Sequence, residues 1–428
     1  MSAMHDVIGT ADVLLGVLSA SHNTGDLYSL VRSSRVVYEV FRSAKRTVLI
    51  SIVARDLGWS GLRTATATTL ITRATFRQGA GYEGDAKTAI KLYESIAHED
   101  RGISFAKGLS EAEFTNLVRI NRGVQFVVDQ YAATRLPRLQ EINLDAGAEL
   151  NFRERQRLAH AFLRHQVLAS IQSLGVITQG TVVYEQLLDL FRPWEVQQIT
   201  DVHSFLRVMA SFVFPSRERI PRSLWGVYLT GREWWRDSDE QEAMGDLVVI
   251  RARFLEKIGH KTMADLEMEL DISKREREAR HNIMPASYNF LAAGSLPQTS
   301  SSQVTEHYWS LRDEIYQRED ALPGLFAVED DEDGSQSAPF GWIDGHRGID
   351  CQRWGGDLFR ETLPPGQENL TALQMNGTRL VVRQWRWLGF IFWDRERVEL
   401  LKSKLPEYAT GWLTRPPPCD DNLSLEGL

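Results

Sequence analysis

The residues with the clearest potential for chemistry lie close together near position 345. Asp344, His346 and Cys351 place a carboxylate, an imidazole and a thiol in the glycine-rich stretch 341–351. An imidazole can activate a thiol as a nucleophile, so these three residues are the candidate catalytic residues. Their spacing matches no zinc-binding signature, and we predict no metal site. One histidine and one cysteine in a loop also occur by chance, so a loop without catalytic function stays an alternative.

Other ionisable residues are expected on or near the surface. His160 and His165 are five residues apart, so one helical face cannot present both to a metal, and surface or half-buried positions are expected. Charged residues at the start of the same segment are expected to face water: Arg153, Glu154, Arg155 and Arg157.

Motifs of the common enzyme classes do not occur in the sequence. There is no Gly-x-x-x-x-Gly-Lys-Ser/Thr loop, no Gly-x-Ser-x-Gly elbow and no His-Glu-x-x-His pair. Dinucleotide-binding glycine motifs are absent as well, so no cofactor is indicated. Enzymes that lack short motifs remain possible.

The composition limits the classes of partner. The chain has 428 residues, of which 43% are hydrophobic and 25% charged, and a formal net charge of −8. These are ordinary values for a globular protein. Nucleic-acid binding is not expected, because it needs a positive surface that displaces counterions from phosphates.

Cysteine content and hydropathy indicate the compartment. Cys351 and Cys419 are the two cysteines, which favours a reducing compartment, the cytoplasm or the nucleus. The apolar run 13–18 is short, and Asp6 and Asp12 stand where a signal peptide carries positive charge. We therefore predict neither a secretion signal nor a membrane span.

Hydrophobic residues recur at three- and four-residue spacing along most of the chain, which predicts a mainly α multi-helix bundle. Ser110 and Glu113 form a capping box for a helix that Pro137 is expected to stop. Further helices are expected over 151–173, from Pro193 onward and over 395–404. The stretch 378–393, rich in Val, Trp, Phe and Ile, predicts short strands, so minor β structure is expected near the C-terminus.

Changes in composition divide the chain into three regions. We predict a helical segment at 1–58, a helical core domain at 59–284, and a loop-rich C-terminal region at 285–428 that packs on the core. The last region contains the Ser-, Gly-, Pro- and Asp-rich segments typical of loops.

Three segments carry a resemblance to a known group of proteins. They are LFRPWEVQQ at 190–198, RERQRLAHAF at 153–162 and LGFIFWDRER at 388–397. Together they resemble a large group of filamentous-fungal helical proteins, many of which begin with an F-box-like segment. The resemblance spans most of the chain and implies no particular reaction.

The N-terminal segment is similar to a degenerate F-box. Thr10-Ala11-Asp12 stands in place of the usual Leu-Pro opening, and the late tryptophan is absent. The resemblance implies that apolar residues of the first two helices bind the adaptor subunit of a cullin-RING ubiquitin ligase. The partner-binding candidates are Leu14, Leu18, Leu27 and Leu30. Three core helices of the main domain are the alternative interpretation.

Two functional hypotheses follow. The first is a non-catalytic protein-interaction module, such as an F-box-like substrate adaptor of a ubiquitin ligase. The second is an enzyme of fungal specialised metabolism, for example with a cyclodipeptide synthase-like activity, and a polar pocket in the helical domain. Inward-facing ionisable groups would favour the enzyme, because burial of such groups costs free energy.

Overall fold

A computed structural model gives the fold. It describes residues 2–21, 24–74, 82–97, 108–173, 193–213, 247–259, 338–346 and 385–404, together with 106, 191, 261–263 and 265. Within these ranges the chain is almost entirely helical and contains no strand, so the predicted mainly α multi-helix class is confirmed.

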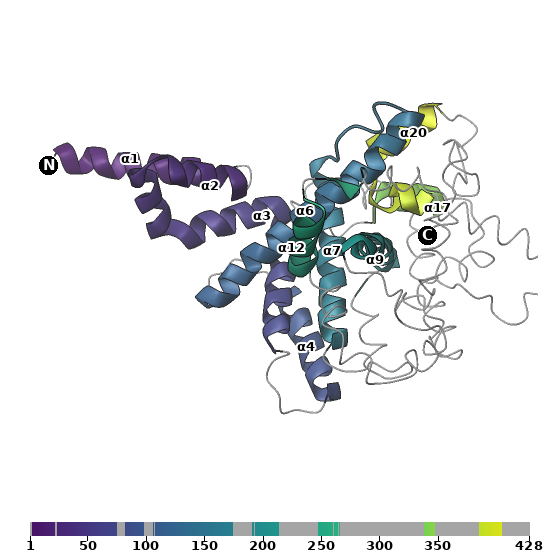
Figure 1. The fold of residues 1–428 in the computed structure, drawn as a ribbon, viewed down its shortest axis with the longest axis horizontal. Coiled ribbons are helices and arrows are strands. Elements are labelled where there is room, and N and C mark those ends of the chain that lie inside the picture. Colours follow the sequence, from purple (N-terminus) through teal and green to yellow (C-terminus); the bar gives the residue numbers. More distant parts are fainter. Residues whose placement is uncertain are drawn as a thin grey trace, which may run out of the picture.

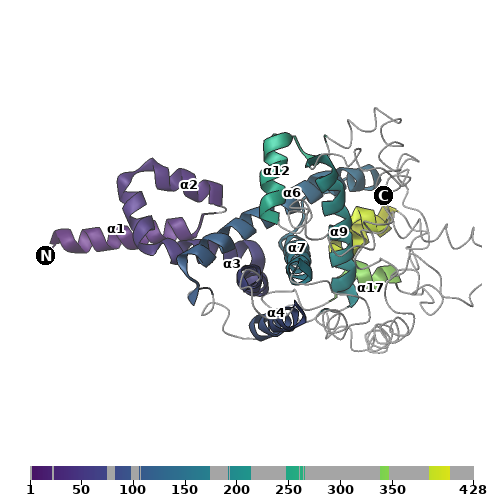
Figure 2. The ribbon, with the colours of Figure 1, turned by 60° about the horizontal axis from the view of Figure 1, so that its bottom comes forward.

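A bundle of long helices forms the body of the molecule (Figures 1 and 2). The order of its helices along the chain is α3 (Arg35–Ala74), α4 (Tyr82–Ala97), α6 (Glu111–Ile142), α7 (Phe152–Ser173), α9 (Pro193–Val213) and α12 (Leu247–Lys257). Helix α7 packs against α3, α6 and α9, while α12 packs on α6. The helix α7 is therefore the central element.

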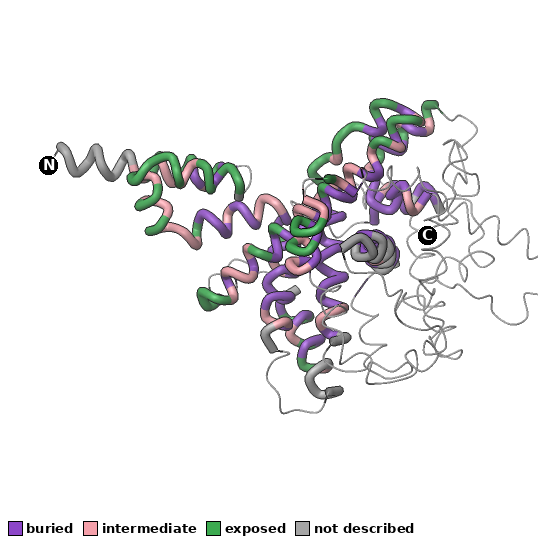
Figure 3. The backbone as a smooth tube through the Cα atoms, viewed as in Figure 1, coloured by how far each residue is buried: buried purple, intermediate pink, exposed green. Residues whose placement is uncertain are grey.

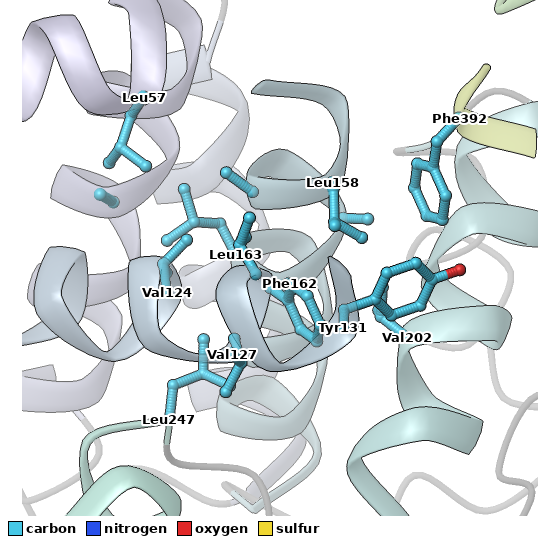
Figure 4. Packing of buried hydrophobic residues seen from close by; sticks show 14 of the residues in the cluster. Leu57, Val124, Val127, Tyr131, Leu158, Phe162, Leu163, Val202, Leu247 and Phe392 are labelled. Carbon is cyan, nitrogen blue, oxygen red and sulfur yellow. The ribbon is translucent and has the colours of Figure 1, made fainter. Parts of the chain in front are cut away.

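Buried apolar residues of four helices meet around α7 (Figure 4). Phe162 of α7 and Tyr131 of α6 contact each other edge to face, with ring centroids 6.4 Å apart. Phe392, far along the chain, meets Tyr131 in the same way at 5.8 Å. The C-terminal segment thus belongs to the core of the bundle.

Two residues with non-helical backbone angles divide α3 into three parts. They are Ala44 (φ −119°, ψ 18°) and Gly58 (φ 69°, ψ 173°). A positive φ strains any residue with a side chain, so glycine suits the second bend. Helices α1 (Ser2–Ser19) and α2 (Thr24–Ser33) both pack on α3. We call residues 2–46 the arm; it projects from one end of the bundle (Figure 1).

The C-terminal elements are short and lie beside α9 and α7. They are α17 (Phe340–His346), the 3₁₀ helix η5 (Phe390–Phe392) and α20 (Arg395–Lys404). The last one has the predicted bounds. Trp385 to Phe392 is helical or turn, so the predicted strands are wrong there, and residues 378–384 lie outside the described part.

The predicted end of α6 at Pro137 is also wrong, because the helix continues to Ile142. Proline removes one backbone donor and costs about 3 kcal/mol inside a helix. Burial of Leu139 in the last turns offsets this cost. The capping box at Ser110 and Glu113 and the start of α9 at Pro193 are confirmed.

Candidate functional site

The arm exposes more large apolar side chains than the rest of the described molecule. Five of the nine exposed large hydrophobic residues lie between positions 13 and 38. They are Val13 (67% exposed), Val17 (48%), Tyr28 (61%), Val36 (60%) and Tyr38 (47%). Exposed apolar side chains that gather in one part of a protein make that part a candidate binding surface. Figure 3 shows that the exposed positions dominate the arm and become fewer in the bundle.

The four leucines predicted to bind a partner are not among these exposed residues. Leu18 and Leu27 are buried in the described structure, and Leu14 and Leu30 are half-buried. The expectation that Leu18 and Leu27 are exposed is therefore wrong: they hold α1 and α2 onto α3. Valines on the neighbouring face of α1 are exposed instead, because one helix presents positions 13 and 17 together.

Hydrogen bonds from the body hold the arm in place. The Arg55 guanidinium of α3 donates to the carbonyl oxygens of Ser19, the last residue of α1, and of Ser21, which follows it. A cation favours the negative end of a helix dipole. Lys45 Nζ also reaches Glu111 Oε1 of α6 at 2.6 Å.

The bundle contains the opposite feature, a set of buried ionisable side chains centred on α7. Glu154 and Arg157 are buried, although the sequence predicted that they face water. His160 and His165 are buried too, so the expected surface or half-buried positions are wrong. All four have partners on other helices or on the C-terminal segment, which explains how α7 tolerates them.

A clamp of charged groups joins the start of α7 to α20. Arg397 donates to both carboxylate oxygens of Glu154, from Nε at 2.9 Å and from a terminal nitrogen at 2.7 Å. It also donates to the carbonyls of Ala146, Ala148 and Glu149. Beside it, Arg157 pairs with Asp394. We call Glu154, Arg157, Asp394 and Arg397 the clamp.

Farther along, α7 and α9 exchange polar contacts. Arg164 pairs with Glu195 at 2.6 Å, and both are nearly buried. His165 Nε2 lies 2.9 Å from His203 Nδ1, so one ring donates a hydrogen bond to the other. Burial, with a contribution from His203, lowers the pKa of His165 well below its usual value. Burial lowers the pKa of His160 to about 3, and its Nε2 donates to the Leu57 carbonyl at 2.8 Å.

A tyrosine and an aspartate meet between α6 and α9. Tyr131 Oη donates to Asp201 Oδ2 at 2.6 Å. Burial raises the pKa of Asp201, and burial together with the Asp201 charge raises that of Tyr131. The guanidinium of Arg135 stacks over the Trp387 ring at 4.0 Å from its centroid. This set could hold or move a proton if a substrate reached it.

The predicted catalytic residues are only partly described. Asp344 of α17 is buried and accepts from Lys402 Nζ of α20 at 2.8 Å. His346 ends α17, but its side chain lies outside the described part, as does Cys351. Their proximity therefore stays a prediction, and Asp344 already has a cationic partner.

No three His, Cys, Asp or Glu side chains in the described part of the chain form a group able to hold a metal ion. None of the described helices has both the length and the apolar character needed to cross a bilayer.

Comparison with models of protein families, with curated proteins and with solved structures found no match.

Proposed function

We propose that this protein is a non-catalytic interaction protein whose arm docks a protein partner. The observation that carries the proposal is the group of five exposed large apolar side chains on the arm. Burial of such a side chain in an interface contributes about 1.5–3 kcal/mol. A partner surface that covers several of them would therefore gain enough free energy for specific binding.

The body suits the role of a recognition domain. Its helices are joined by buried ion pairs between α7, α9 and α20, which favour one arrangement of the helices over others. A fixed body lets the arm hold its partner at a defined distance from anything bound to the body.

The partner that the F-box resemblance suggests is the adaptor subunit of a cullin-RING ubiquitin ligase, in the cytoplasm or the nucleus. Leu18 and Leu27 are buried and cannot contact a partner, whereas Leu14 and Leu30 are half-buried. We propose Val13, Val17 and Tyr28 as the main contact residues, together with the accessible parts of Leu14 and Leu30.

A direct binding measurement tests this proposal. Purified full-length protein is titrated with the purified adaptor by calorimetry, alongside the Val17→Asp and Tyr28→Asp variants. Both variants should lose binding at least tenfold. Phe152→Asp is the matched control, because Phe152 is equally exposed but lies on the body. Absence of binding by the unaltered protein rejects the adaptor, and equal loss in the control rejects the arm as the site.

A second candidate function, an enzyme of specialised metabolism, is favoured by the buried contact between Tyr131 and Asp201. Buried ionisable groups with raised pKa values are common where proteins transfer protons. The test compares small-molecule products of cells that express the unaltered chain and the Asp201→Asn variant. A product that disappears with the substitution, while the variant stays folded, supports the enzyme; identical product profiles reject this site.

A further inference from the structure

We infer that the arm recognises a partner segment with an apolar face flanked by carboxylates. This inference rests on the proposed function and concerns residues 28–46, at the end of α2 and the start of α3, which we call the basic corner. The proposed ligand is a segment of another protein, and the basic corner selects it by its carboxylates.

The basic corner is only partly buried. None of the nineteen residues 28–46 is buried, although the segment contains many apolar side chains. Half-buried apolar residues lie between the exposed ones: Leu30, Val31, Val37, Val40 and Phe41. The basic corner therefore has apolar surface that the arm itself leaves partly uncovered, and a partner can cover it.

The basic corner also carries an excess of positive charge. The basic corner contains five cationic residues, Arg32, Arg35, Arg42, Lys45 and Arg46, and one carboxylate, that of Glu39. This local excess contrasts with the net charge of −8 of the whole chain. A positive patch attracts carboxylates of a partner and speeds association.

Two arginines of the basic corner, Arg32 and Arg35, have no carboxylate partner within the described residues. Arg42 pairs with Glu39 at 3.1 Å, and Lys45 and Arg46 reach Glu111. Arg32 instead stacks over Tyr28, with its guanidinium 5.2 Å from the ring centroid. Tyr28, Tyr38, Arg32 and Arg35 are all exposed, and tyrosine and arginine dominate the strongest contacts of protein interfaces.

The apolar content separates a protein from the other ligands of basic surfaces. A phosphate backbone offers no apolar surface to cover Val36, and nucleic-acid bases stack on aromatic rings rather than on a valine. A membrane-surface helix needs its continuous apolar face outward. In α3 that face carries Val37, Val40 and Phe41, which are half-buried because it is turned partly toward the core.

Two synthetic peptides test the inference. Both are helical, with one leucine stripe, and the stripe is flanked by glutamates in one peptide and by lysines in the other. Fluorescence anisotropy with the full-length protein should detect binding of the glutamate peptide only. Arg32→Glu and Arg35→Glu should each weaken binding at least tenfold, whereas Arg253→Glu, an exposed arginine on α12, should leave it unchanged.

Equal binding of both peptides, or glutamate-peptide binding that survives both substitutions, overturns the inference. Binding of anionic lipid vesicles or of single-stranded RNA that the same substitutions abolish assigns the basic corner to those ligands and overturns it too. Light scattering that shows a dimer dissociated by Arg32→Glu assigns the surface to a second copy. If the adaptor binds through Val17 and Tyr28 while neither peptide binds, this inference fails and the proposed function stands.

Discussion

The arm and the bundle distribute their side chains in opposite ways. The arm leaves valines and tyrosines in water, while the bundle takes glutamate, arginine and histidine side chains out of water around α7. In the bundle the buried side chains of Glu154, Arg164 and His165 meet partners from another helix or from the C-terminal segment. In the arm Val13, Val17 and Val36 remain exposed. Within the described residues, the bundle therefore pairs these buried charges internally, while the arm leaves apolar surface uncovered.

The largest expected effect is the loss of the clamp. Glu154→Ala leaves Arg397 buried without its carboxylate, and removal of one member of a buried ion pair costs about 3–5 kcal/mol. Urea unfolding should show a decrease of that size in the free energy of unfolding. Glu141→Ala removes an exposed pair with Arg138 and should cost less than about 1 kcal/mol. Equal losses in the two variants would contradict the role of the clamp.

A second prediction concerns the contact between α17 and η5. A Cβ atom at Gly341 would lie 2.2 Å from the Phe390 carbonyl oxygen, so Gly341→Ala forces the two segments apart. Overpacking of this kind costs about 1–3 kcal/mol. Thermal unfolding should detect it. Gly16→Ala is the control, because a Cβ there meets nothing within 4 Å, and in a helix alanine is favoured over glycine. A stable Gly341→Ala variant would show that these segments are not closely packed.

The third prediction is a loss of stability in mild acid. The pKa of His160 falls to about 3 in the folded protein, and that of His165 is also lowered, against 6.5 in the unfolded chain. The unfolded chain therefore binds more protons below pH 6.5, and stability is lost as the pH falls from there towards the folded pKa values. Each histidine contributes a slope approaching about 1.4 kcal/mol per pH unit.

Urea unfolding between pH 7.5 and pH 5 measures this slope. The raised pKa values of Asp201 and Asp56 act in the opposite direction, as the folded protein takes up their protons first. The His160→Gln variant should therefore show a shallower slope than the unaltered protein. An unchanged slope would mean that His160 is already accessible to water.

The smallest expected effect on stability is in the arm. Val17→Asp and Tyr38→Ser alter exposed side chains, so the free energy of unfolding should change by less than about 0.5 kcal/mol. Leu18→Asp on the same helix places a charge at a buried position and should unfold the arm, which a loss of helical circular dichroism would report. Equal changes in stability and helical circular dichroism for Val17→Asp and Leu18→Asp would contradict the difference in burial between the two faces of α1.

Much of the fold could be predicted from the sequence, since helix boundaries depend on local signals. The capping box at Ser110 and Glu113, the start of α9 at Pro193 and the bounds of α20 all come from neighbouring residues. The end of α6 could not be predicted, as burial in the turns after Pro137 outweighs the local preference of proline.

The buried charges could not be predicted for a related reason. The partners of Glu154 and Arg157 lie more than two hundred residues away, so a local pattern of charges looks the same whether they face water or Arg397 and Asp394. In the arm, the resemblance to an F-box pointed to apolar residues of the first two helices, but it could not tell which of them α3 covers. Leu18 was therefore expected outside, whereas Val13 and Val17 are the exposed positions.

The clamp also affects how the protein is made. Glu154 and Arg397 are 243 positions apart, a distance that a ribosome covers in about 12–50 s. During that time α7 exists without the cation that neutralises its carboxylate, so the emerging chain must keep Glu154 hydrated. A chain that stops before Arg397 would leave the buried Glu154 without its cation, so the packing at the start of α7 depends on a residue that is made much later.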